Sequence, residues 1–292
     1  MHLGMTLPSF VVGVDGTTIR EWCARIDDGP FSCVAVGERV AYPSHDLITS
    51  LAFAAAATRR VRLVSTIAVA PTHDAVRLAK QAATIDVLSE GRLTLGVGVG
   101  GRDQDYEAVG ASTAARFAKL DEQVEIMRSV WRGDVVVDGV APIGPTPVQP
   151  NGPPILTASM GPKSLARSAR WADGLSGFDL APDIDSVQST FDAVRIAWTK
   201  SGRKERPWLS TSTWFALGDD AAERLHGYAR NYLSTFGDAA ADAMACMCRL
   251  SDPGVLRDVV AALETTGCDE FVLVPTTDDP RELDRLVDAL GA

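Results

Sequence analysis

The sequence lacks the spacings that metal sites and disulfide frameworks usually require. It contains no C-x-x-C pair, and its four histidines are scattered without H-x-x-x-H spacing. An odd number of cysteines is typical of free thiols in a reducing compartment. We therefore expect no metal centre, and we expect a cytoplasmic location. The five cysteines are Cys23, Cys33, Cys246, Cys248 and Cys268.

Positive charge and long apolar runs are also scarce. Lys and Arg number 28 against 38 Asp and Glu, which gives a formal net charge of −10. Nucleic acids and anionic membranes require a basic face, so neither is an expected partner. No stretch reaches the roughly 18 apolar residues of a membrane span, and the start of the chain lacks a basic segment followed by an apolar run. The expected partner is a small-molecule substrate.

A built-in nucleophile is missing as well. Nothing resembles a Ser-His-Asp arrangement, and no cysteine has an obvious activating partner. An enzyme without its own nucleophile or metal usually takes its reactivity from a cofactor.

The chain does contain a regular alternation of strand-like and helix-like segments. A length of 292 residues is typical of one barrel domain, here residues 1–292. Eight strands alternating with helices predict an α/β fold, a closed parallel (β/α)8 barrel of the TIM type, with an open doubly wound sheet as the alternative. The expected strands are residues 3–7, 31–36, 61–65, 93–97, 155–158, 174–178, 208–217 and 271–274.

A glycine-rich turn follows the fourth predicted strand. Residues 96–101 formally match G-x-G-x-x-G, but a dinucleotide fingerprint must open a helix in an early strand–helix–strand unit. The next clear helix lies well downstream, so we reject that interpretation. Glycine lets a backbone approach a flat ring closely, which predicts a cofactor wall, and a tight barrel corner is the alternative.

The loop after the fifth predicted strand has the features of an anion site. Pro162 suits a first helical turn and leaves the amides of Lys163 and Ser164 free to face an anion. Lys163, Arg167 and Arg170 fall on one helix face. This basic stripe predicts a phosphate clamp with further anionic groups along it, or simply a solvated basic face.

Ionisable residues follow the second and fourth strands. Glu38 with Arg39, and Asp105 with Tyr106, are candidate catalytic residues at the carboxyl-terminal rim, where barrel enzymes place their chemistry. A carboxylate beside a guanidinium stays ionised and suits orienting a polar substrate, and a surface ion pair is the alternative. We expect His45 and His73 to help start the helices that follow them.

The segment from Leu78 to Gly101, with the sequence LAKQAATIDVLSEGRLTLGVGVGG, resembles the bacterial luciferase-like family of flavin-dependent monooxygenases and deazaflavin-dependent reductases. The residues TRRVRL at 58–63, QP at 149–150 and ADG at 172–174 agree with it. The likeness extends over nearly the whole chain and favours the barrel over the open sheet.

The resemblance implies a flavin-type ring in the barrel mouth. The family's third strand ends in a bulge, often with a non-proline cis peptide, and Ser65 and Thr66 hold that place here. The implied cofactor-binding residues are these two, the glycine turn and the phosphate loop: Ser65, Thr66, Gly98, Val99, Gly100, Gly101, Arg102, Ala158, Ser159, Met160, Gly161, Pro162, Lys163 and Ser164.

The chain departs from the family at one position. Many members carry an acidic residue followed by a proton-transferring histidine after the second strand, where this chain has Glu38 and Arg39. Arginine is no general acid near neutral pH, so Arg39 is expected to hold an anionic substrate group or a ring oxygen instead. The chain is also short for the family, which implies a reduced insertion and a more open mouth.

The resemblance leaves several functions open. One is hydride transfer with the deazaflavin coenzyme (F-420), which the basic stripe slightly favours because that coenzyme has an acidic tail. Another is monooxygenation with reduced FMN, which a separate flavin reductase would supply. A non-catalytic flavin-binding protein and a phosphosugar-processing barrel are the remaining alternatives. Family members are often homodimers.

Overall fold

Eight parallel strands close into a barrel in sequence order, as the sequence predicts. The computed structural model describes residues 1–291. Each strand pairs with the next along the chain, and β8 closes the barrel against β1. The strands are β1 (His2–Thr6), β2 (Cys33–Val36), β3 (Arg62–Val69), β4 (Leu93–Gly98), β5 (Ile155–Thr157), β6 (Gly174–Ser176), β7 (Trp208–Phe215) and β8 (Glu270–Pro275).

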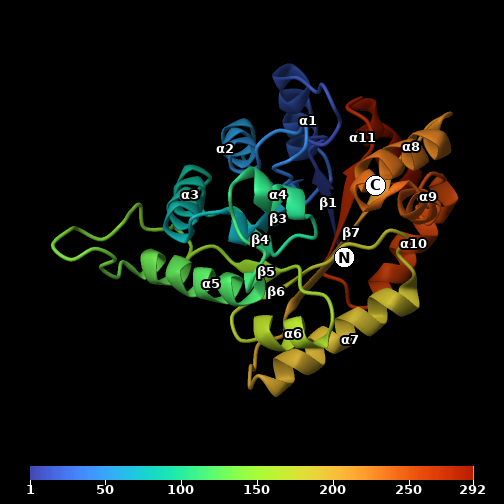
Figure 1. Ribbon diagram of the computed structural model, residues 1–292. Coiled ribbons are helices and arrows are strands. Elements are labelled where there is room, and N and C mark those ends of the chain that lie inside the picture. The colour runs from blue at the N-terminus through green and yellow to red at the C-terminus, as the bar shows by residue number, and fades with distance from the viewer. Residues whose placement is uncertain (292) are drawn as a thin grey trace.

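Helices surround the barrel and form the connections between its strands (Figure 1). Side-chain caps start several of them: Asp15, Asp46, Asp74 and Asp183 each accept a hydrogen bond from a first-turn amide. The helices are α1 (Gly16–Asp28), α2 (Leu47–Ala57), η1 (Ala70–Thr72), α3 (Ala75–Leu88), α4 (Asp103–Ala108), α5 (Arg116–Arg132), α6 (Pro162–Ser168), α7 (Ile184–Lys200), α8 (Ala221–Leu233), η2 (Ser234–Phe236), α9 (Asp238–Ala245), α10 (Pro253–Thr265) and α11 (Arg281–Leu290).

The third strand is longer than the sequence indicated because it contains a bulge. Its pairing with β4 shifts register between Ser65 and Ala68, and the Thr66–Ile67 peptide is cis. The bulge that the family resemblance implied is therefore confirmed. Gly96 on β4 makes the close approach sterically allowed, since a Cβ atom there would lie 2.2 Å from the Ser65 carbonyl oxygen.

The glycine turn after β4 leads directly into a short helix. The prediction that the next helix lies well downstream was wrong, because α4 begins at Asp103, immediately after Arg102. The rejection of a dinucleotide fold still holds, because this unit belongs to a closed barrel and contains its fourth strand.

A second apolar cluster lies beside the main barrel core. It joins α8 and α9 to β7 through Trp214, Leu225, Leu233 and Ala241, which are all buried. Figure 1 shows these two helices packed side by side at one side of the barrel, next to β7. The segment between β7 and β8 thereby brings apolar side chains to one side of the barrel mouth.

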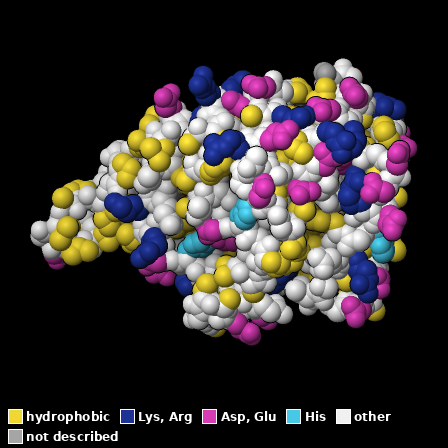
Figure 2. Space-filling model, turned by 90° about the horizontal axis from the view of Figure 1, so that it is seen from above, with side chains coloured by type: hydrophobic (Ala, Val, Ile, Leu, Met, Phe, Trp, Pro, Cys, Tyr) yellow, Lys and Arg dark blue, Asp and Glu magenta, His cyan; other side chains and the backbone are white. Residues whose placement is uncertain are grey.

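An arm protrudes between α5 and β5, at the left of Figures 1 and 2. Residues 134–154 of this arm contain no helix or strand, and β5 begins directly after them. A tight turn lies at Asp138 and Gly139, with the Val140 amide bonded to the Val137 carbonyl. Hydrophobic side chains line the arm in Figure 2, and its exposed valines are Val135, Val136, Val137, Val140 and Val148.

Replacing Gly96 by alanine tests the contact between β3 and β4. The new methyl group would overlap the Ser65 carbonyl, so we expect the free energy of unfolding to fall by about 1–3 kcal/mol. Gly227→Ala is the matched control: Gly227 lies in α8 with open space around it and no left-handed φ, so alanine should stabilise that helix by roughly 0.5–1 kcal/mol. Urea unfolding of both variants measures the difference, and equal stability of the two would contradict the account.

Candidate functional site

A cavity of about 830 Å³ opens at the carboxyl-terminal ends of the strands. This is the end at which barrel enzymes hold their ligands, and the volume is in the usual range for small-molecule sites. Its wall combines residues within β3 and β7 with residues that follow β1, β2, β4, β5 and β6 and with residues from α7 and the α8–α9 segment. Residues far apart in the sequence therefore share one chamber.

Eight of the fourteen predicted cofactor-binding residues line this cavity. They are Thr66, Gly101, Arg102, Ala158, Ser159, Met160, Gly161 and Pro162. The other six adjoin it without contributing to its wall: Ser65, Gly98, Val99, Gly100, Lys163 and Ser164.

The glycines of the turn have two different roles. Cβ atoms at Gly98 and Gly100 would press on Ile67 and Val69 of β3, so these two positions form a tight barrel corner. A Cβ atom at Gly101 would meet nothing within 4 Å, and this residue faces the cavity. The tight barrel corner is therefore confirmed at Gly98 and Gly100, and the cofactor wall stays a prediction for Gly101.

The loop before α6 presents free backbone donors. Gly161 has φ +84°, and Pro162 occupies the first helical position. The first amide to bond within the helix is that of Leu165, which donates to the Gly161 carbonyl. The amides of Lys163 and Ser164 precede it and have no acceptor inside the helix.

The basic stripe on α6 is not a free basic face. Arg167 and Arg170 both approach Asp121 of α5, at 2.5 and 3.5 Å, and the Trp171 indole donates to the same carboxylate. These two arginines thus help to hold α6 against α5; Arg170, two residues beyond the end of the helix, is still 64% exposed. Lys163 stays exposed at the start of the helix.

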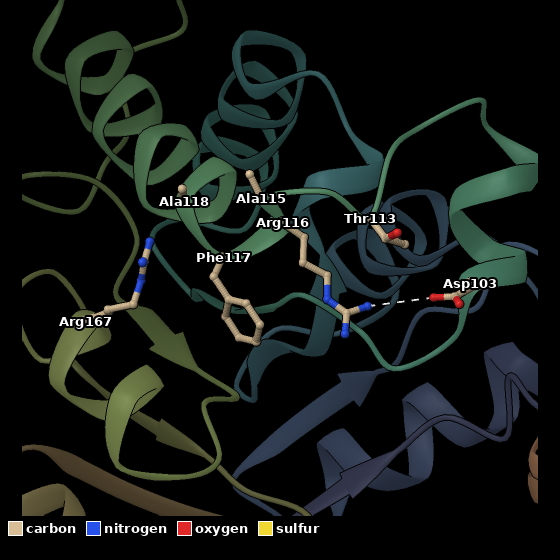
Figure 3. A pocket seen from close by; sticks show the side chains of 7 residues that line it. All are labelled: Asp103, Thr113, Ala115, Arg116, Phe117, Ala118 and Arg167. Carbon is tan, nitrogen blue, oxygen red and sulfur yellow. Dashed lines mark ion pairs between the residues drawn. The ribbon is translucent and has the colours of Figure 1, made fainter.

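A smaller, more open pocket of about 490 Å³ lies beside this loop, between α5 and α6. Figure 3 shows Arg116 extending toward Asp103 across it, with Arg167 on the opposite side and Phe117 between them. The Arg116–Asp103 distance is 3.9 Å, a loose ion pair. Sequence analysis missed Arg116, although a basic residue in the first turn of a long helix, where it opposes the helix dipole, was a usable signal.

Glu38 pairs with a histidine from another loop, not with its neighbour Arg39. The His73 Nε2 atom lies 2.8 Å from Glu38 Oε1, and Glu38 Oε2 accepts a hydrogen bond from the Val69 amide. His73 does not cap α3, because Asp74 does, and His45 does not cap α2, because Asp46 does. The helix-start role expected of both histidines was wrong. Glu38 is buried, so a surface ion pair is excluded for it.

Arg39 turns instead toward Asp105. Its Nε atom lies 3.4 Å from Asp105 Oδ2, and both side chains are at most 4% exposed. The second carboxylate oxygen, Asp105 Oδ1, accepts hydrogen bonds from the amides of Val40 and Ala41. Tyr106 is buried, and its hydroxyl donates to the Val99 carbonyl. The four candidate catalytic residues thus lie behind the cavity wall and hold the rim loops together.

Aromatic side chains contribute a wall that sequence analysis did not identify. Phe10, Phe178, Trp214, Tyr232 and Phe236 all line the cavity. Tyr232 and Phe236 come from the helical segment after β7, so their approach to β1 and β4 depends on the folded geometry and leaves no local sequence signal.

One carboxyl group also faces the cavity. Asp179 follows β6, and burial raises the pKa of its carboxyl, opposed by a hydrogen bond from the Ala181 amide. Sequence analysis assigned Asp179 no role. Its position at the rim was the available signal.

The described residues contain neither a membrane-spanning helix nor a cluster of metal ligands. No described helix combines the length and the apolar character that crossing a bilayer requires. Within residues 1–291, no three His, Cys, Asp or Glu side chains lie close enough to hold a metal ion.

The Glu38–His73 pair predicts a pH-dependent contribution to stability. Burial alone would lower the pKa of His73, but the hydrogen bond and charge of Glu38 raise it above the ordinary 6.5. A raised folded-state pKa means that the pair stabilises fully below the unfolded-state value, and that this stability is lost as pH rises through the folded-state value. His73→Gln should therefore cost about 1–2 kcal/mol at pH near 5.5 and less at pH near 8.5.

Chemical denaturation at the two pH values measures this difference. The control is His226→Gln, because the contact of the His226 ring is with the Cys246 thiol and not with a carboxylate. A cost of His73→Gln that is the same at both pH values would contradict the charged pair.

Two curated relatives are similar over part of the chain. An uncharacterised protein of Mycobacterium tuberculosis (strain ATCC 25618 / H37Rv), Rv0953c, is 34% identical over 167 residues, 55% of this chain and 58% of that protein. The oxygenase component of a flavin-dependent trigonelline monooxygenase from Acinetobacter baylyi is 29% identical over 230 residues, 74% of this chain and 64% of that protein. The chain thus matches less than two thirds of the length of these relatives.

Solved structures resemble the whole barrel. The monooxygenase RslO1 from Streptomyces bottropensis superposes with a TM-score of 0.80 at 23% identity, covering 99% of this chain and 98% of that one. An F420-dependent secondary alcohol dehydrogenase, in complex with an F420-acetone adduct, superposes with a TM-score of 0.77 at 18% identity, covering 99% of both chains. At these identities the likeness concerns the fold alone.

The family model described as luciferase-like monooxygenase matches residues 1–274, nearly the whole barrel. Together with the β3 bulge and the cavity at the barrel mouth, this match establishes that the chain belongs to the luciferase-like family.

Proposed function

We propose that the protein is an oxidoreductase that binds a flavin-type cofactor in the barrel cavity and acts on a small organic substrate beside it. The observation that carries the proposal is the cavity itself, whose wall includes the β3 bulge at Thr66 and Ile67 together with the open backbone at Gly101 and Gly161. A flavin-type ring, once bound, would supply the redox chemistry that the side chains of this site do not provide.

The residues present fit a flat, polar ring. The hydroxyls of Thr6 and Ser9 face this cavity, and both are buried without a hydrogen-bond partner. A buried polar group costs free energy unless it is paired, so these hydroxyls suit the ring nitrogens and oxygens of a bound cofactor. The wall is open at Gly101, where a Cβ atom would meet nothing within 4 Å, whereas the Phe10 ring packs against Gly37.

The cofactor's phosphate would lie at the loop before α6. The amides of Lys163 and Ser164 have no acceptor inside the helix, and Arg116 lines the smaller pocket together with Arg167 of α6. Backbone donors and a guanidinium together form a typical phosphate site. Arg167 has a smaller part in this proposal because it is held by Asp121.

The ion pairs of Arg167 and Arg170 with Asp121 favour FMN over the deazaflavin coenzyme. A long acidic tail would need several free cations along the stripe, and two of its three cations already pair with Asp121. We therefore propose reduced FMN and monooxygenation as the first function, with a separate flavin reductase as the electron source. The deazaflavin coenzyme stays the second candidate, because one structural neighbour with this fold is F420-dependent.

The other polar residues would position the reaction. Asp179 can hold a proton at the cavity wall, since burial raises the pKa of its carboxyl. Glu38 and Arg39 brace the β2–α2 loop through His73 and Asp105. The aromatic residues exclude water from the chamber. Catalytic turnover with reduced cofactor would distinguish this proposal from a non-catalytic flavin-binding protein.

A fluorescence titration of the protein with FMN and the deazaflavin coenzyme, each oxidised and reduced, tests the proposal. We expect saturable binding, tightest for reduced FMN. Arg116→Gln should weaken FMN binding by about tenfold, because a charge-assisted hydrogen bond to phosphate contributes roughly 1.5 kcal/mol. Riboflavin, which lacks the phosphate, should bind the variant and the original protein equally.

The control variant is Arg77→Gln, an exposed arginine on α3, which should leave every affinity unchanged. Exclusive binding of the deazaflavin coenzyme would make the protein a hydride-transfer enzyme. Binding of neither cofactor would overturn the proposed function and favour a barrel acting on other small molecules.

A further inference from the structure

Arg102 is the one cationic side chain among the residues that line the barrel cavity in the described chain. Its guanidinium lies over the rings of Tyr232 and Phe236, at 4.6 and 5.3 Å from their centroids. Its Nε atom is buried without a hydrogen-bond partner, and within residues 1–291 it has no carboxylate within ion-pair distance. Such a group is incomplete without an acceptor.

The surrounding charges leave this corner of the cavity positive. Arg39 also lies over Tyr232, at 5.3 Å, and its charge is offset by Asp105. The second oxygen of Asp105 accepts hydrogen bonds from backbone amides, and its ion pair is with Arg39. Burial and the nearby charge of Arg39 lower the pKa of the Arg102 guanidinium, opposed by Tyr232 and Asp105. An anion at Arg102 would relieve both effects.

Aromatic rings extend from Arg102 along the same wall. Tyr232 meets Trp214 edge to face at 5.1 Å, and Trp214 meets Phe178 in the same way at 4.9 Å. Phe10 packs against the other side of Tyr232 at 5.4 Å. All of these rings line the cavity. Edge-to-face rings provide a surface on which another flat ring packs well.

We propose that the substrate is a planar aromatic anion, with its carboxylate or phenolate bound by Arg102 and its ring packed against Tyr232 and Trp214. This inference rests on the proposed function, because it assigns the aromatic side of the cavity to the substrate and the side at Thr66 and Ile67 to the cofactor. Arg102 is then a residue that determines substrate specificity. Arg39 is a positioning residue, because its guanidinium lies over the Tyr232 ring.

Calorimetric binding of matched probes tests the inference. The probes are benzoate and 1-naphthoate, each paired with its neutral amide, and binding is measured on the protein alone and on the protein saturated with cofactor. We expect the carboxylates to bind about tenfold more tightly than the amides, as one charge-assisted hydrogen bond implies. Arg102→Gln should abolish this preference, and Arg102→Lys should restore part of it.

Two further variants separate the contributions. Tyr232→Ala should weaken carboxylate and amide alike, because both lose the ring contact. Arg77→Gln, at an exposed position on α3, should change nothing. Cofactor affinity should stay within about twofold in Arg102→Gln, because this inference reassigns Arg102 from the predicted cofactor-binding residues to the substrate.

Four results would overturn the inference, and one would support the anion site while rejecting the redox function. Equal affinity for carboxylates and amides, failure to bind any of the carboxylates, or a preference that survives Arg102→Gln would overturn the inference. A loss of cofactor affinity in Arg102→Gln as large as the loss of probe affinity would also overturn it, by assigning Arg102 to the cofactor. A carboxylate preference that depends on Arg102, in a protein that binds neither cofactor, would support the anion site and reject the proposed redox function.

Discussion

The contact between β3 and β4 at Ser65 and Gly96 is the constraint on which the site depends. Because Gly96 has no side chain, the Ser65 carbonyl can lie where a Cβ atom would otherwise be, and β3 continues beyond it as a bulge. The bulge brings Thr66 and Ile67 to the cavity wall. The barrel thus has an irregular inner surface at the carboxyl-terminal end of its strands.

A second constraint is the way in which the rim loops are fastened. Glu38 reaches His73, and Arg39 reaches Asp105, so two adjacent residues after β2 connect to the loops after β3 and β4. Buried charged groups of this kind are stable only when they are paired, and here each carboxylate also accepts backbone hydrogen bonds. The rim is consequently held by polar contacts while its inner face stays largely apolar. Arg102 differs from Arg39 in having no carboxylate within ion-pair distance among residues 1–291, and this is the basis for assigning an anionic substrate.

The sequence was sufficient to predict the barrel, and much less so to predict the partners of its side chains. The alternation of strands and helices predicted eight strands in the observed order. The family resemblance, carried mainly by residues 78–101, implied the bulge in β3. The contacts that local patterns did not predict include those of Glu38, Arg167 and Arg170, whose partners lie 35 to 49 residues away in the sequence. Local patterns determine which face of an element is buried. They carry no information about which distant charge meets which.

The aromatic wall illustrates the same limit. Tyr232 and Phe236 lie in a helical segment whose pattern predicts only an amphipathic helix, yet the fold places them against Phe10 and Arg102 from the first half of the sequence. Arg102 was predicted to bind the cofactor from its place after the glycine turn, and it lines the cavity. Its chemical role emerges only from the charges and rings around it.

The most direct test of the central claim is a crystal structure of the protein with its flavin-type cofactor bound. The account predicts the ring inside the barrel cavity, packed against Thr66 and Ile67, with its phosphate at the Ser159–Ser164 loop and with Arg102 left free beside the aromatic wall. A ring bound outside the barrel, or one stacked on Tyr232 with its phosphate at Arg102, would contradict the account.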